Sequence, residues 1–258
     1  MIGNIFDSHA HYDDEKFDED RDVILSSLPS QGICAVVNCA SDLKSSAFSA
    51  ELSEKYDFIF FACGVHPHEA EKTDDLILKS ELENLIKRNK CVAIGEIGLD
   101  YHYNFSPRNI QKEIFEYQLS LAKDCDFPVI IHDRDAHEDT LKLLKKYRPK
   151  GVVHCFSGSV EMASEIVKLG MYIGLGGAVT FKNAKKPVEV AAYVPETRIL
   201  LETDCPYMAP VPFRGKRCSS DMIPYTAQII ADIRGLDVQN VVNTATENAE
   251  ELFNVEVL

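Results

Sequence analysis

Six side chains of the kinds that bind metal ions stand at or just after short apolar runs of the sequence. Four are imidazoles and two are carboxylates: His9, His11, His132, His154, Glu96 and Asp204. A mixed nitrogen and oxygen set suits Zn, Mn, Fe or Co, whereas Mg prefers more oxygen. Six ligands are too many for one tetrahedral ion with an open position. They predict two ions that share a carboxylate, an arrangement that can hold the attacking and leaving oxygens of a hydrolysis.

Each of these residues also has an ordinary structural explanation. His9 and His11, two residues apart, point the same way from an extended strand, but they are also compatible with a polar loop. His132 and His154, each taken alone, are compatible with a core or loop histidine whose hydrogen bonds are made within the protein. Glu96, which ends "CVAIGE", is harder to explain, because a carboxylate on a buried strand must be paired, protonated or bound to a metal. The recurrence of such residues at the ends of apolar runs favours the metal site, with Glu96 as the bridging ligand.

Two acids lie close together at the end of one apolar run, in "RILLETDCPY" at residues 198–207. Asp204 would bind a cation, whose charge offsets the repulsion between the acids. Glu202 lies two residues earlier on the same strand face, so we expect it to accept a hydrogen bond from a metal-bound histidine. The alternative for Glu202 is an ion pair with a lysine of a covering helix.

Eight apolar runs alternate with segments of helical period, which predicts a (β/α)8 barrel of the TIM type. The runs cover residues 2–6, 33–39, 58–63, 91–96, 127–131, 151–155, 171–175 and 198–204. The helical segments cover residues 18–32, 41–56, 74–90, 106–125, 136–147, 159–170, 183–193 and 219–235, and an extra C-terminal helix follows at 237–255. Continuously hydrophobic strands are typical of a parallel sheet covered by helices. A doubly wound open sheet is the alternative. We expect one domain over residues 1–258, with the site at the carboxyl ends of the strands.

Composition limits the partners and the compartment. The net charge of −14 argues against broad binding to nucleic acid phosphates, unless the acids form a cation site and a solvated exterior. Eight cysteines without a C-x-x-C spacing, and no secretory leader, predict reduced thiols in the cytoplasm. No apolar run approaches the roughly 18 residues of a membrane helix, so we expect a soluble protein without a membrane partner, with a monomer favoured.

Long motifs through nearly the whole chain resemble the TatD-type metal-dependent deoxyribonucleases, within the amidohydrolase-like barrels. They include "FDSHAHYD", "GVHPHE", "GEIGLDYHYNFSPRNIQ", "PVIIHDRDAHEDTL", "HCFSG", "RILLETDCPYMAPVPFRGKR" and "TENAEELF". The resemblance implies a TIM-like barrel, two divalent ions (Mg, Mn or Zn) and hydrolysis of DNA phosphodiester bonds, commonly from a 3′ end. DNA, single-stranded or at 3′ ends, is the implied partner. The family's metal ligands match the six residues above, and Asp204, with Glu96, is implied as catalytic through the attacking water.

Other residues are candidates for substrate contacts. His66 in "GVHPH" could meet a phosphate or a metal-bound water, or be a turn histidine set by Pro67. Arg134 could hold a phosphate with its planar fork, or pair with a neighbouring acid. Arg214 and Arg217 belong to the basic loop "FRGKR", which could contact a DNA backbone or be a solvated charge run. Aromatic faces that could stack on bases or be packing belong to Tyr101, Tyr103 and Tyr207.

Two departures from the family pattern stand out. Cys218, Ser219 and Ser220 follow "RGKR", where the family usually has Asn-Glu-Pro, which leaves open how the loop is anchored. Cys205 follows the ligand Asp204, and its thiol is either packing or a site sensitive to oxidation. Two other functions are weighed beside the nuclease. One is hydrolysis of a carboxylic ester or amide, such as an aminoacyl-tRNA bond. The other is a catalytically idle barrel, which predicts missing ligands; none is missing.

Overall fold

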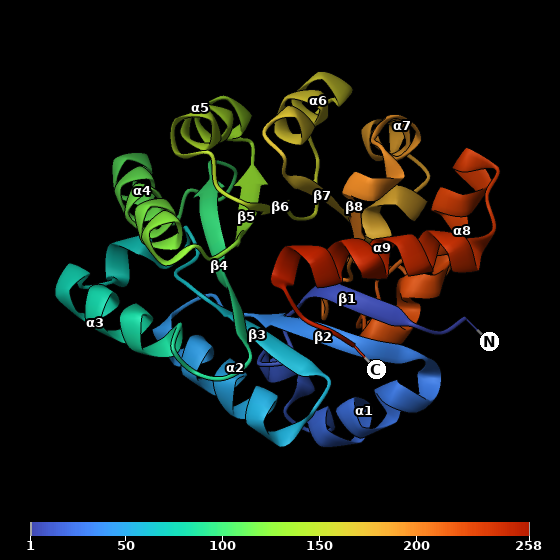
Figure 1. Cartoon of the computed structure of the whole chain (residues 1–258), viewed down its shortest axis with the longest axis horizontal. Coiled ribbons are helices and arrows are strands. Elements are labelled where there is room, and N and C mark those ends of the chain that lie inside the picture. Colours follow the sequence, from blue (N-terminus) through green and yellow to red (C-terminus); the bar gives the residue numbers. More distant parts are fainter. Residues whose placement is uncertain (1, 258) are drawn as a thin grey trace.

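Eight parallel strands form one sheet that curls into a barrel, with the strands in sequence order from β1 to β8. The computed structural model describes residues 2–257, apart from the side chains of residues 75 and 76. The strands are β1 (Ile5–Ala10), β2 (Ile33–Cys39), β3 (Ile59–Cys63), β4 (Cys91–Asp100), β5 (Val129–Arg134), β6 (Gly151–Val153), β7 (Tyr172–Leu175) and β8 (Ile199–Leu201). The predicted (β/α)8 barrel is confirmed, and the open-sheet alternative is excluded (Figure 1).

The barrel closes between its first and last strands. Ala10 forms a parallel bridge with Cys205, just beyond the end of β8. The backbone N–H of Asp204 donates to the carbonyl of His9 at 2.9 Å, and that of His11 donates to the carbonyl of Cys205 at 2.8 Å. These bonds set the two ends of the predicted ligand set, His9/His11 and Asp204, side by side.

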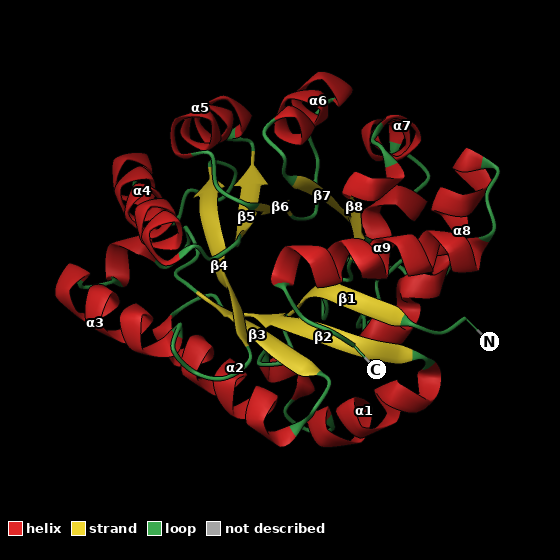
Figure 2. Ribbon diagram, viewed as in Figure 1, coloured by secondary structure: helices red, strands yellow, loops and turns green. Residues whose placement is uncertain are grey.

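Helices surround the barrel (Figure 2). They are α1 (Arg21–Ser27), α2 (Leu43–Lys55), α3 (Asp75–Leu85), α4 (Arg108–Cys125), α5 (His137–Tyr147), α6 (Val160–Lys168), α7 (Lys185–Tyr193), α8 (Ile223–Arg234) and α9 (Val238–Phe253). Short polar side chains fix several helix starts, because they accept from backbone N–H groups that the first turn leaves unpaired. Asp42, Ser159 and Asp237 do so for α2, α6 and α9. Within residues 2–257, no helix combines the length and the hydropathy needed to cross a lipid bilayer.

The expected C-terminal helix, α9, covers the end of the barrel where the strands begin. The hydroxyl of Thr246 donates to the carbonyl of Asn4, just before β1, and the amide of Asn248 donates to the carbonyl of Ile199 at the start of β8. Phe253 stacks on Phe6 of β1, with ring centroids 6.0 Å apart. This end of the barrel is therefore closed by apolar packing, and the opposite end is left for the site.

Alternating positions of the strands build an apolar layer below a polar one. Ile130, Val152 and Leu200 belong to the apolar cluster that also contains Phe253. Two residues further along lie His132, His154 and Glu202. Because side chains at i and i+2 share one face of a strand, the same register that fills the barrel with hydrocarbon delivers the polar groups to its carboxyl end.

The strand boundaries differ from the predicted ones where the polar residues lie. The first strand is Ile5–Ala10 rather than residues 2–6, so His9 lies in the strand. The fourth continues past Glu96 to Asp100, and the eighth ends at Leu201 rather than at residue 204. An apolar pattern marks buried hydrocarbon, and it does not detect strand residues whose buried side chains are polar and paired.

Candidate metal centre

The predicted ligands meet at the carboxyl ends of the strands. Three groups of side chains have ligand atoms within 4.8 Å of one another, and they are His9–His11–Asp204, His9–Glu96–His154 and His66–Glu96–His132. The six predicted ligands are all among them, together with His66, which was predicted only as a substrate contact. A cavity of about 850 Å³ opens above them. The tertiary structure therefore gathers residues that are up to 195 positions apart, from His9 to Asp204, into one cluster.

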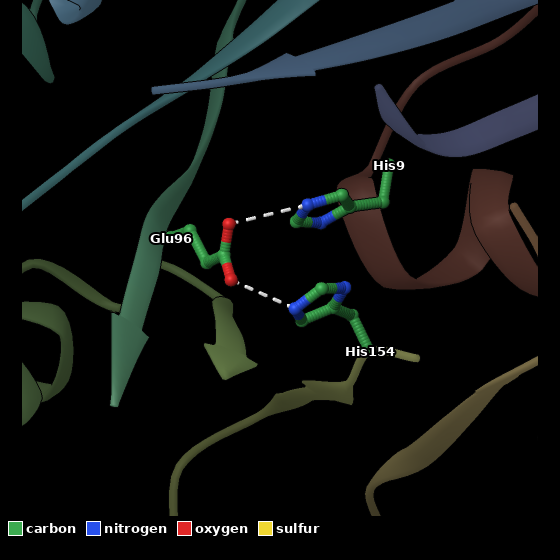
Figure 3. Close-up of side chains that lie close together, drawn as sticks. All are labelled: His9, Glu96 and His154. Carbon is green, nitrogen blue, oxygen red and sulfur yellow. Dashed lines mark hydrogen bonds and ion pairs between the residues drawn. The ribbon is translucent and has the colours of Figure 1, made fainter. Parts of the chain in front are cut away.

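Glu96 lies at the centre of the cluster, and Figure 3 shows its two carboxylate oxygens facing the stacked rings of His9 and His154, one oxygen toward each ring. Its Oε2 lies 3.3 Å from Nε2 of His9 and 3.5 Å from Nε2 of His11. Its Oε1 lies 2.7 Å from Nδ1 of His132 and 2.8 Å from Nε2 of His154. Oε1 also lies 3.4 Å from Nε2 of His66. Each carboxylate oxygen thus faces a different set of histidines, which is the arrangement that a bridging ligand needs.

An irregularity of β4 aims Glu96 inward. Ile94 is paired with Val129 and Ile97 with Ile131, so three steps along β4 match two along β5. Such a bulge leaves its extra residue outside the regular ladder and redirects its side chain, and bulges are common beside active sites. Glu96 lies within this bulge, and its side chain is 4% exposed.

Hydrogen bonds fix which ring nitrogens face the cluster. Nδ1 of His11 lies 2.7 Å from the carbonyl of Cys39, which can only accept, so the proton is on Nδ1. In the neutral ring, Nε2 then directs a lone pair at Nε2 of His9, 3.0 Å away. Nε2 of His132 lies 3.2 Å from Asp100 Oδ2, which leaves Nδ1 for the centre. Lone pairs that converge in this way fit a bound cation.

The carboxylates concentrate positive charge in the cluster. Burial alone would raise the pKa of Glu96, but the surrounding histidines, His154 first, hold it well below its usual range. Burial alone would lower the pKa of His11, yet its hydrogen bond to Asp204 and the charge of Glu96 raise it to about 10. Burial and the neighbouring His154 lower that of His9 to about 3. The acids therefore draw cationic charge to this point, and the donor set fits divalent ions.

Glu202 lies behind His154, but it is not hydrogen-bonded to that ring. Its Oε1 accepts from the backbone N–H of Cys155 at 2.5 Å and lies 3.8 Å from Nδ1 of His154, too far for a hydrogen bond. Among the described residues, Nδ1 of His154 and Oε2 of Glu202 have no partner. Burial raises the pKa of Glu202 to about 8. The two side chains are therefore close but not hydrogen-bonded, and no lysine of the described residues forms an ion pair with Glu202.

Asp100 is a residue of the centre that the sequence reasoning missed. Its Oδ2 accepts from His68 at 2.9 Å and from His132 at 3.2 Å. Its Oδ1 accepts from the backbone N–H groups of His102 and Tyr103, both at 2.9 Å. The motif "GEIGLDY" could have indicated it. Asp100, like Glu96, is a carboxylate within an apolar run, and a buried carboxylate needs a partner.

Asp7 was missed as well. It is fully buried in β1, where Oδ1 accepts from the backbone N–H of Thr203 at 3.0 Å and Oδ2 accepts from the hydroxyls of Thr203 and Ser220, both at 2.7 Å. Burial raises its pKa to about 6. Asp7 therefore ties β1 to the segment that carries Asp204 and to the chain after Arg217.

Four of the predicted substrate residues line the cavity: His66, Tyr103, Arg134 and Tyr207. The guanidinium of Arg134 lies 4.6 Å from the ring centroid of Tyr103. It does not pair with its neighbours as the alternative proposed, since those two acids, Asp133 and Asp135, contact His137 and His102. Tyr207 also lines the cavity, and its hydroxyl donates to Asp14 at 2.7 Å. Tyr101 instead donates to Asp139 at 2.7 Å, a packing role.

The basic loop is placed differently from the prediction. Arg217 pairs with both oxygens of Asp20, at 2.8 and 2.5 Å, and the guanidinium of Arg214 lies 4.3 Å from the ring of Phe181. Within the described part of the chain, neither arginine is among the residues that line the cavity. Arg217 anchors the loop through this ion pair, and its role as a substrate contact stays a prediction. A bidentate ion pair explains this placement, and sequence spacing does not reveal its partner.

The two departures from the family pattern are structural. Cys218 is buried, and its N–H donates to the carbonyl of Pro206 at 3.0 Å, while Ser220 bonds to Asp7. Cys205 is fully buried, and burial raises the pKa of its thiol well above its usual value. A thiol that stays protonated is a poor target for oxidation, which favours the packing explanation.

Comparison with known proteins agrees with this centre. The family model described as TatD related DNase matches residues 6–254. YabD of Bacillus subtilis, an uncharacterized metal-dependent hydrolase, is 41% identical to this chain. The match covers 97% of this chain and 99% of YabD. YcfH of Escherichia coli, also an uncharacterized metal-dependent hydrolase, is 34% identical and covers 98% of this chain and 96% of its own.

Solved structures agree as well. The crystal structure of YjjV, a TatD homologue from Escherichia coli K12, has a TM-score of 0.92 and 32% identity, covering 99% of this chain and all of YjjV. A TatD-family hydrolase from Entamoeba histolytica has a TM-score of 0.88 and 25% identity, covering 98% of this chain and 99% of its own. With the family model matched from the first strand to the end of the last helix, this chain belongs to the TatD family of metal-dependent hydrolases.

Proposed function

We propose that this protein is a deoxyribonuclease that removes nucleotides from 3′ ends of DNA, with two divalent ions (Mg, Mn or Zn) held by His9, His11, Glu96, His132, His154 and Asp204. The observation that carries the proposal is the position of Glu96, whose two oxygens face different sets of histidines. A centre that holds two ions about one carboxylate suits the in-line displacement at a phosphodiester. The description of the family model supports DNA as the substrate.

Bound divalent ions would polarise the phosphoryl oxygen and acidify the attacking water. Asp204 is suited to accept the proton of that water. It lines the cavity, its side chain is 19% exposed, and its pKa is lowered because hydrogen bonding and charge from His11, with charge from His154, outweigh burial. Glu96 is more deeply buried and lies against histidines on both sides, so we assign it to binding and orientation.

His66 is placed to donate to the substrate. Its Nδ1 accepts from the backbone N–H of His68 at 3.2 Å, so the neutral ring carries its proton on Nε2. Burial lowers the pKa of His66 to about 4, which keeps the ring neutral. Nε2 lies 3.4 Å from Glu96 and the residue lines the cavity. We propose that this N–H donates to a phosphoryl oxygen beside the metal centre.

The charge of the cavity favours a strand end as the substrate. Acidic side chains at its wall include Asp13, Asp14 and Asp133, and among the described residues Arg134 is the one lysine or arginine that lines it. A long duplex requires many cationic contacts with phosphates, and this cavity does not provide them. The cavity is better suited to one or two phosphates of a single strand, with Arg134 in contact with one of them.

The same acidic wall favours a second candidate, hydrolysis of a carboxylic ester or amide such as an aminoacyl bond on tRNA. A metal centre of this kind also polarises carbonyl oxygens, and an ester carries less negative charge past Asp13 and Asp14. Rates on 3′-aminoacyl esters and on DNA, measured side by side with one preparation, separate the two functions.

The test of the nuclease uses purified protein that is stripped of metal and reloaded with Mg, Mn or Zn. We expect release of mononucleotides from single-stranded DNA labelled at either end, with products that identify the polarity. Glu96→Gln and Asp204→Asn should each abolish release, whereas Asp57→Asn, at a fully exposed position, should retain it. Full activity of Glu96→Gln, or activity without any metal, would refute the proposal.

We further propose that the protein acts as a monomer in the cytoplasm. Its eight cysteines are all free, which suits a reducing compartment. Light scattering of the metal-loaded protein tests the monomer, and fractionation of cells tests the compartment.

A further inference from the structure

Two stacked aromatic rings form a ledge beside the cavity. Tyr103 and Phe105 lie with their ring centroids 5.3 Å apart and their planes 14° from parallel. Tyr103 lines the cavity, and Phe105 extends the pair beyond it. We call these two residues the aromatic ledge.

The ledge is exposed to solvent. Tyr103 is 49% exposed and Phe105 is 64% exposed. Isolated apolar side chains are common on protein surfaces, but a stacked pair beside a polar cavity has the composition of a binding site for a planar ligand. The chain supplies a contrast in Tyr193 on α7, which is 56% exposed and is not among the described residues that line the cavity.

The ledge is held in a fixed relation to the metal centre. Asp100 accepts from the backbone N–H of Tyr103 with one oxygen and from His132 with the other. The ring of His68 lies edge-on to Phe105 at 4.8 Å and 6.2 Å from the ring of His132. One buried carboxylate therefore positions both a metal-binding ring and the ledge, and a preorganised surface costs less ordering on binding.

A cation accompanies the ledge. The guanidinium of Arg134 lies 4.6 Å from the ring centroid of Tyr103 and borders the cavity. A planar aromatic surface with an arginine beside it offers the two contacts that a nucleotide needs, one for the base and one for the phosphate.

We propose that the aromatic ledge stacks a nucleobase of the strand whose phosphodiester lies at the metal centre, with Arg134 bonded to a neighbouring phosphate. The inference rests on the proposed nuclease function and names the base-binding subsite of that same centre. Because every base has a π-face, the ledge binds all bases and selects a strand with unpaired bases over one in a duplex.

The first test compares a normal oligonucleotide with one of the same length whose 3′-terminal residues lack bases. For the unaltered protein, we expect KM to be roughly tenfold higher on the abasic strand, with kcat nearly unchanged, since stacking contributes binding in both ground and transition states. In Tyr103→Ala and Phe105→Ala the two substrates should have similar KM values. Phe105→Tyr should keep the tenfold ratio, and Tyr193→Ala is the matched control. An undiminished ratio in both alanine variants would overturn the inference while leaving the nuclease function intact.

The second test does not require catalysis. The chain contains no tryptophan, so Phe105→Trp introduces a single fluorescent reporter at the ledge and Tyr193→Trp provides its control. In metal-loaded protein, a phosphorothioate oligonucleotide should quench the reporter at residue 105, the abasic strand should not, and the control should respond to neither. If the protein does not cleave DNA but the quench depends on the bases, the proposed function fails and the ledge stands. Equal responses to both strands refute the ledge.

Discussion

Asp100 fixes the ring of His132, because its Oδ2 lies 3.2 Å from Nε2 and thereby turns Nδ1 toward Glu96, 2.7 Å away. Nothing in the sequence indicated that Asp100 and His132 are in contact. The contact joins β4 to the neighbouring strand β5. Mutation can test whether this carboxylate orients His132, a candidate metal ligand.

Asp100→Asn should weaken metal binding by about 10- to 100-fold, because such partners set the orientation and basicity of the ligand. The fold should persist, since the side-chain oxygen still accepts from the N–H groups of His102 and Tyr103. Titration of chelator-treated protein with Zn or Mn measures the affinity. An unchanged affinity would show that His132 is oriented by other contacts or does not bind metal.

Removal of metal should lower the melting temperature. A ligand that binds only the folded state stabilises it by about 2.7 kcal/mol at a concentration 100 times its Kd. The gain disappears with a strong chelator and returns when the ion is added back. In His11→Ala the chelator should change the melting temperature by less, because this variant lacks one ring of the cluster. Identical melting curves with and without chelator would argue against a tightly held ion.

Gly174→Ala should destabilise the fold by about 1–3 kcal/mol through overpacking. A Cβ at this position would lie 3.0 Å from Cδ of Glu202 and 3.0 Å from the backbone Cα of His154, which cannot move away easily. Gly3→Ala is the matched control, since nothing lies within 4 Å of its added carbon. Urea denaturation of both variants measures the difference. Equal stabilities would mean that both Glu202 and the backbone at His154 move away without cost.

Ser220→Ala should cost about 1.5–3 kcal/mol, because it removes a buried hydrogen bond to the carboxyl of Asp7. The matched control is Ser80→Ala. Ser80 is exposed and its hydroxyl donates to the carbonyl of Ile77 in its own helix, so we expect a change of about 0.5 kcal/mol or less. A small effect at Ser220 would show that the segment after Arg217 does not need this anchor.

His137 should make stability depend on pH. Its Nδ1 lies 2.8 Å from Asp133, and mainly this hydrogen bond raises its pKa above the ordinary value of 6.5, although burial opposes the shift. Because the pKa is raised in the folded state, this interaction stabilises the fold by its full amount below pH 6.5. That stabilisation is lost as the pH rises through the raised pKa. The difference in unfolding free energy between the unaltered protein and His137→Gln should therefore shrink with rising pH. NMR titration of His137 provides the direct reading, and a pKa at or below 6.5 would contradict the prediction.

The sequence by itself determined the barrel and the types of side chain that form the candidate metal centre. Apolar runs at regular spacing require a covered parallel sheet, and a parallel barrel brings the ends of all its strands to one rim. His9, Glu96 and Asp204 could therefore be expected together before any coordinates, because each follows or interrupts such a run. Local helix starts were equally accessible, as the caps at Asp42 and Asp237 illustrate.

The tertiary structure alone decided which partner each polar group has. Glu96 faces inward because of a bulge that depends on the register between β4 and β5. Asp100 and Asp7 have hydrogen-bond partners in other elements of the fold. Arg217, predicted as a DNA contact, forms an ion pair with Asp20, 197 positions away. Hydrophobic periodicity reports which side chains are buried, and it does not report the long-range partners of polar ones, whose hydrogen bonds exist only once the chain has folded.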